Sequence, residues 1–100
     1  MKKKAVLVMA LFGLMVFSGC GESPDVPAMK SGLLRSGMTE QQANCLAEKM
    51  SDTVDGEQYN YMAALMKEGL SETEAGTRTR RKYGADFRTG ISEARKACPE

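Results

Sequence analysis

Apolar residues follow a helical spacing along most of the chain after residue 27. In one stretch, for example, Ala43, Leu46, Ala47 and Met50 fall on a single stripe. Val, Ile and Thr nowhere alternate with polar residues over a useful length, so no strand is expected. The pattern predicts an all-α domain, a small bundle of four or five short helices. The predicted helices cover residues 28–36, 40–53, 56–68 and 72–83, and a last one begins after residue 86.

Two segments 32 residues apart repeat one pattern of glycine, apolar residue, hydroxyl residue and acid. They are residues 37–43 (GMTEQQA) and 69–75 (GLSETEA). Glycine can end a helix in the left-handed conformation, and Thr39 or Ser71 can then cap the next helix. Each copy therefore predicts a tight corner between two helices. Two copies are too few for a solenoid, in which stacked repeats generally number three or more.

The start of the chain has the features of an export signal. Three lysines at positions 2–4 precede a mostly apolar run over residues 5–17, and two small residues, Ser18 and Gly19, follow. The run has 13 residues, whereas a membrane-spanning helix needs about 20. A cleaved signal is therefore favoured over a transmembrane anchor.

The segment Phe17-Ser18-Gly19-Cys20 resembles the lipobox of bacterial lipoproteins, although Phe17 stands where Leu is usual. The resemblance covers residues 1–20 only. It implies that the Cys20 sulfur receives a diacylglyceryl group, that residues 1–19 are removed and that the new amino terminus is acylated. Because Gly21, and not Asp, follows the cysteine, it also implies an outer-membrane location facing the periplasm.

Lipidation of Cys20 would explain the odd number of cysteines. Cys45 and Cys98 would then remain as one pair, which predicts a disulfide in an exported domain. Cys45 lies nearly opposite the apolar stripe of its own helix, whereas Cys98 continues the stripe of the last helix. A disulfide therefore requires that the Cys45 helix be contacted on two sides. The alternative is that the helical phase assigned near Cys45 is wrong.

These features divide the chain into three parts. Residues 1–19 are a removed signal peptide, residues 20–27 a lipidated cysteine with a flexible tether, and residues 28–100 a helical domain. Processing removes three lysines and leaves 11 basic against 13 acidic residues, a net charge of −2. The basic balance of the precursor thus belongs to the signal, and no nucleic-acid partner is predicted.

The residue types offer little for catalysis. The chain has no histidine, which removes the usual general base and the commonest zinc ligand. Glu40, Glu72 and Glu74 are explained as residues of the first turn of a helix, where the dipole favours them. We therefore predict no catalytic residue, no metal site and no cofactor.

Two groups of residues are candidates for binding. The first is a basic run of Arg78, Arg80, Arg81 and Lys82, with Arg88 nearby. Arg78, Arg81 and Lys82 share one helix face and could meet phosphates or an acidic partner. The alternative is a solvated face in which Glu74 pairs with Arg78 four residues on.

The second candidate is Tyr61, which lies beside an apolar stripe of its own helix. This stripe contains Tyr59, Met62 and Met66, and is either a partner-binding surface or simply core.

The predicted function is a lipid-anchored, non-enzymatic protein–protein interaction module, held to the membrane by acyl chains on Cys20 and bound to another envelope protein. The alternative is an electrostatic module that docks its basic helix on anionic lipid or acidic envelope polymer.

Overall fold

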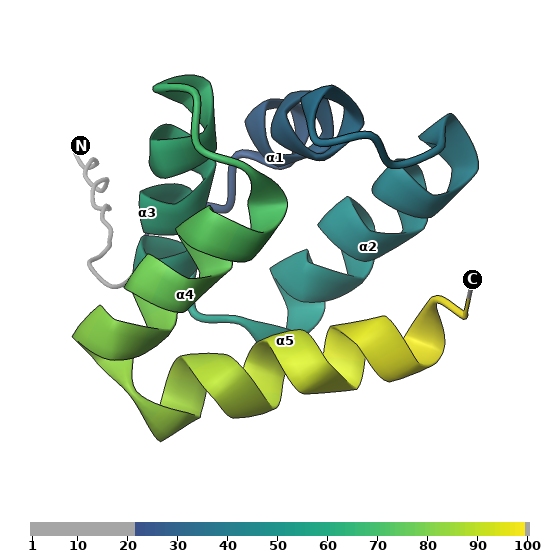
Figure 1. The fold of residues 1–100 in the computed structure, drawn as a ribbon. Coiled ribbons are helices and arrows are strands. Elements are labelled where there is room, and N and C mark those ends of the chain that lie inside the picture. The colour runs from purple at the N-terminus through teal and green to yellow at the C-terminus, as the bar shows by residue number, and fades with distance from the viewer. Residues whose placement is uncertain (1–21, 100) are drawn as a thin grey trace, which may run out of the picture.

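The computed structural model describes residues 22–99, which form five α-helices joined by short turns (Figure 1). No strand occurs within these residues, so the predicted all-α class is confirmed. None of the helices between residues 22 and 99 has both the length and the hydropathy of a membrane span. The helices are α1 (Val26–Arg35), α2 (Glu40–Thr53), α3 (Gly56–Lys67), α4 (Glu72–Tyr83) and α5 (Ala85–Ala97).

The two repeated corners form as predicted. Gly37 and Gly69 end their helices at φ of 100° and 114°, in the region that favours glycine. The Thr39 hydroxyl accepts the Gln42 N–H and the Ser71 hydroxyl accepts the Glu74 N–H, each at 3.2 Å. The corners also contact each other, because the Ser36 hydroxyl accepts the Glu72 N–H at 2.8 Å.

Each helix packs against two main neighbours, in the cyclic order α1, α2, α5, α4, α3 and back to α1. α2 and α5 run antiparallel. Cys45 is disulfide-bonded to Cys98 with 5.9 Å between their Cα atoms, and Thr53 Oγ1 donates to the Gly90 carbonyl at 2.7 Å. α2 is therefore contacted on two sides, by α1 and α5, so the helical phase assigned near Cys45 is correct.

Large apolar side chains fill the space that the helices enclose. Tyr59 is fully buried, and its hydroxyl donates to the Ala47 carbonyl of α2 at 2.6 Å. Met62 and Met66 are also buried, so the stripe on α3 is core and not a partner-binding surface. The other largest buried side chains are Met29, Leu33, Met50, Thr79 and Phe87.

The predicted flexible tether over residues 20–27 requires correction for its described part. α1 already begins at Val26, because the Asp25 carboxylate accepts the Ala28 N–H at 3.2 Å and Pro27 is compatible with the first turn of a helix. The residues before it are held by Asn60, which accepts the Asp25 N–H at 2.8 Å and donates to the Ser23 carbonyl at 3.0 Å. Cys20 and the lipobox lie outside the described residues.

Candidate functional site

The predicted basic face of α4 is exposed, but its residues differ in whether an acidic side chain already pairs with them. Arg78 Nη2 lies 3.9 Å from Glu74 Oε2, which is the predicted pair four residues apart. Exposed surface pairs of this kind contribute little stability. Arg81 points to solvent and has no ion-pair partner within the described residues.

Lys82 contacts aromatic rings of both α3 and α4. Its Nζ lies 5.4 Å from the centre of the Tyr61 ring and 5.5 Å from that of Tyr83. The two rings meet edge to face at 5.6 Å. The Tyr83 hydroxyl donates to Glu57 Oε2 at 3.0 Å, and partial burial together with this bond raises the Tyr83 pKa. The structure thus unites two predicted binding residues, Tyr61 and Lys82, in one surface cluster.

A groove between α4 and α5 brings together arginines that the sequence does not place on one surface. It is a hollow of about 290 Å³ with Arg80 on one wall and Arg88 and Arg95 on the other. Phe87 and Ile91 of α5 provide its apolar part. We call this hollow the α4–α5 groove; its remaining lining residues are Glu72, Thr73, Gly76, Thr77 and Ser92.

The charge of the α4–α5 groove is positive. Arg95 pairs with Glu72 across the groove, so these two charges offset each other. In the part of the chain that the structure describes, neither Arg80 nor Arg88 has an ion-pair partner. Both side chains are exposed and remain available to an acidic ligand.

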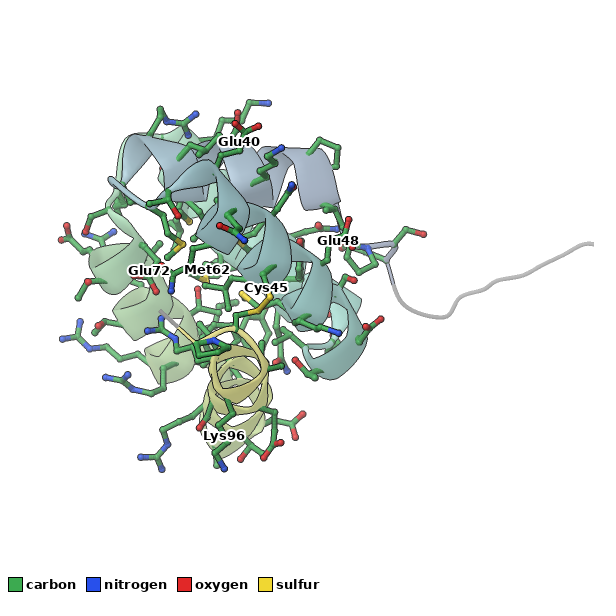
Figure 2. The ribbon with its side chains drawn as sticks, turned by 90° about the vertical axis from the view of Figure 1, so that its right-hand side faces the viewer. Glu40, Cys45, Glu48, Met62, Glu72 and Lys96 are labelled. Carbon is green, nitrogen blue, oxygen red and sulfur yellow. A yellow bond between two sulfur atoms is a disulfide. The ribbon has the colours of Figure 1, made fainter. Side chains whose placement is uncertain are left out.

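The α4–α5 groove continues past the Glu72–Arg95 pair into a second hollow of about 400 Å³. The same two residues line both hollows. The second hollow is lined by Met38 and Leu46 on one side and by Cys98 on the other. Figure 2, which looks onto the C-terminal end of α5, shows Cys45 directly above α5 and Glu72 to the left of it. The disulfide therefore holds one wall of the second hollow in place.

The floor of the groove is open because of a glycine that core packing does not require. A Cβ added at Gly76 would meet only Met62 Cε, at the ordinary contact distance of 3.8 Å. At Gly32, by contrast, an added Cβ would lie 2.8 Å from Met66 Cβ. A mid-helix glycine costs about 1 kcal/mol of helix propensity relative to alanine. Close helix packing explains Gly32, but it does not explain Gly76.

The described residues contain no group of three or more Cys, Asp or Glu side chains placed to hold a metal ion. Glu72 lies in the groove but is engaged by Arg95. The groove therefore offers cationic, hydroxyl and apolar contacts to a ligand. This chemistry suits binding of an acidic segment.

Sequence reasoning found Tyr61 and the basic run with Arg88 nearby, but it missed Arg95 and the pairing of Arg80 with Arg88 across a groove. The signal in the sequence that could have separated the two surfaces is the angular position of each residue around its helix. Arg80 and Lys82 are two residues apart and so about 200° apart around α4, which places them on different flanks. The chain matches no protein-family model, no curated protein and no solved structure.

Proposed function

We propose that this chain is a small lipid-anchored helical protein of the cell envelope that acts as a non-enzymatic protein–protein interaction module. Its ligand is an acidic, amphipathic segment of another envelope protein, bound in the α4–α5 groove. The observation that carries this proposal is the placement of Arg80 and Arg88, both free of ion pairs within residues 22–99, on opposite walls of a partly apolar hollow.

The two kinds of contact would select different features of the segment. Arg80 and Arg88 would form charge-assisted hydrogen bonds with carboxylates along its edges. Ile91, which is only partly exposed, would meet its apolar side, and Gly76 leaves space for that side to approach. From Arg88 to Cys98 along α5 the distance is about 15 Å, enough for two to three turns of a bound helix.

The anchor and location in this proposal come from the lipobox resemblance at residues 17–20. Acyl chains on Cys20 would hold the domain at the membrane, and Gly21 favours the outer membrane, with the domain in the periplasm. The disulfide between Cys45 and Cys98 agrees with an oxidising compartment, since such bonds are rare in the cytosol.

A second candidate function is electrostatic docking on anionic lipid or acidic polymer. Arg81, which is exposed and has no ion-pair partner among residues 22–99, favours it, although Glu74 already partly neutralises Arg78. Ionic strength separates the two candidates, because attraction between exposed charges is screened at high salt while an interface with apolar contacts persists. Binding to purified acidic polymer that disappears at high salt would favour the second candidate.

Site-specific crosslinking in intact cells tests the first candidate. A photoreactive benzoylphenylalanine replaces Thr77, which lines the groove, or Arg81, which is exposed on the same helix but does not line the groove. We expect one major protein adduct from position 77 and none of that mass from position 81. Mass spectrometry of the adduct should place the crosslink in an acidic segment.

Charge reversal then tests the role of the arginines. In the Thr77 crosslinking chain, Arg88→Glu should reduce the adduct at least about tenfold, since close charge pairs at interfaces contribute more than one decade of affinity. The matched control, Arg81→Glu, makes the same change of charge outside the groove and should leave the yield unchanged. Equal adducts at positions 77 and 81, or equal effects of the two reversals, would rule out the groove as the site.

A further inference from the structure

The first described residues of the chain are fixed to the N-terminal part of α3. The Asn60 side chain donates to the Glu22 carboxylate and to the Ser23 carbonyl, each at 3.0 Å, and accepts the Asp25 N–H. Gly56 leaves room for the Glu22 carbonyl, which the Cβ of any other residue would overlap. The chain therefore enters the domain at a defined place.

This place limits how an anchored domain can sit on its membrane. Cys20 precedes Glu22 by two residues, and two residues span at most about 7 Å. If Cys20 carries acyl chains, as the proposed function holds, the surface around Glu22 must lie at the headgroup region of the bilayer. The inference below rests on that anchor.

The surface around Glu22 contains the group of Tyr61, Tyr83 and Lys82, which we call the tyrosine–lysine cluster. Glu22, Tyr61 and Tyr83 line one shallow hollow together with Glu57. Both tyrosines are partly exposed and Lys82 is exposed. The cluster thus lies beside the point where the chain arrives from Cys20.

We propose that the tyrosine–lysine cluster is the surface by which the anchored domain rests on the bilayer that holds the acyl chains of Cys20. Tyrosine is enriched at membrane interfaces because its ring is apolar and its hydroxyl polar, and lysine extends its ammonium to the headgroups. Glu22 and Glu57 line one hollow with the two rings that Lys82 contacts, so the contact is not driven by net positive charge and should depend little on salt.

This orientation leaves the α4–α5 groove accessible. Lys82 and Arg80 lie on different flanks of α4, about 200° apart. The flank with Lys82 and Tyr83 contacts α3, whereas the flank with Arg80 lines the groove with α5. A domain that rests on its tyrosine–lysine cluster therefore presents the groove to a partner at the membrane surface.

Lysine footprinting of the native lipidated protein tests the proposal. The protein is reconstituted in vesicles of phosphatidylethanolamine and phosphatidylglycerol and treated with an acetylating reagent, and each lysine is quantified by mass spectrometry. Lys96 is the internal control, because its side chain is 72% exposed near the far end of α5. Relative to the denatured protein, Lys82 should be acetylated several-fold more slowly than Lys96.

A second protein separates shielding by the membrane from shielding by the fold. It carries a flexible Gly/Ser linker of about 20 residues after Gly21, with a typical span of about 25 Å, so that it keeps its anchor but loses its fixed distance from the bilayer. In this protein Lys82 should approach the reactivity of Lys96. Tyr61→Ser, without the linker, should also reduce the protection of Lys82.

The outcomes distinguish this inference from the proposed function. Acylated protein in which Lys82 and Lys96 react equally would overturn the membrane contact and leave the anchor standing. Protection of Lys82 that survives the long linker would mean that the fold alone shields it, which also overturns the inference. Protein without acyl groups on Cys20 would overturn the anchor and the inference together.

Discussion

At the scale of single residues, the buried hydroxyl of Tyr59 makes stability depend on pH. Burial, with the nearby negative charges of Asp25 and Glu48, raises the pKa of Tyr59 well above its ordinary value. The folded state therefore disfavours the tyrosinate. The contribution of this group to stability is complete below the unfolded pKa of about 10 and is lost as the pH rises above that value.

Tyr59→Phe tests this dependence. The variant should lose about 1 kcal/mol at neutral pH, because the hydrogen bond to Ala47 is removed, but it should lose less stability than the wild type between about pH 10 and 12. Tyr61→Phe is the control, since Tyr61 is only partly buried. Urea unfolding at neutral pH and between about pH 10 and 12 measures the loss of stability and its dependence on pH. Equal alkaline slopes for Tyr59→Phe and the wild type would contradict the role of the Tyr59 hydroxyl.

Two helical glycines should respond oppositely to alanine. At Gly90 the added Cβ would lie 2.5 Å from the Thr53 carbonyl oxygen of α2, so Gly90→Ala should destabilise the protein by about 1–3 kcal/mol. Gly76 has room for a methyl group, so Gly76→Ala should raise the free energy of unfolding by up to about 1 kcal/mol. Urea denaturation measures both, and destabilisation of equal size would show that Gly76 is also required for packing.

At the scale of elements, the disulfide fixes the C-terminal end of α5 against α2. It closes a span of 53 residues, for which the loop-entropy estimate is about 4 kcal/mol. Replacing Cys45 and Cys98 by serine should therefore lower the free energy of unfolding by roughly that amount. Amide hydrogen exchange should increase most in the second half of α5, and an increase spread evenly over all helices would contradict this local role.

Helix boundaries were predictable wherever the chain carries explicit stop and start signals. The Gly-apolar-hydroxyl corners at Gly37 and Gly69 gave the correct starts of α2 and α4. α1 begins two residues before the predicted start, because proline fits the first turn of a helix and Pro27 is therefore part of α1 and not of a tether. α5 also begins earlier than predicted, since Gly84 both ends α4 and precedes α5 without a side-chain cap.

At the scale of the whole molecule, the sequence predicted the disulfide pair and part of one surface but not the groove. Helical periodicity shows which residues share a face of one helix. The α4–α5 groove depends on how two helices are placed, which brings Arg80 together with Arg88 and Arg95. The same limit applies to Glu22, because only the fold places it next to Tyr61 and Tyr83.

The proposals concern two surfaces with separate roles. The tyrosine–lysine cluster, beside the point where the chain enters from Cys20, would rest on the membrane. The α4–α5 groove, on the other flank of α4, would hold the acidic segment of a partner. Both roles rest on the proposed anchor at Cys20, which would place the domain within reach of the bilayer.

The intact mass of the protein extracted from its native envelope in mild detergent tests that anchor most directly. The account predicts a chain that begins at Cys20, carries a diacylglyceryl group and an amide-linked acyl chain, and is two hydrogens lighter because Cys45 and Cys98 are joined. A mass that includes Met1, or a chain that begins at Cys20 without acyl groups, would contradict it.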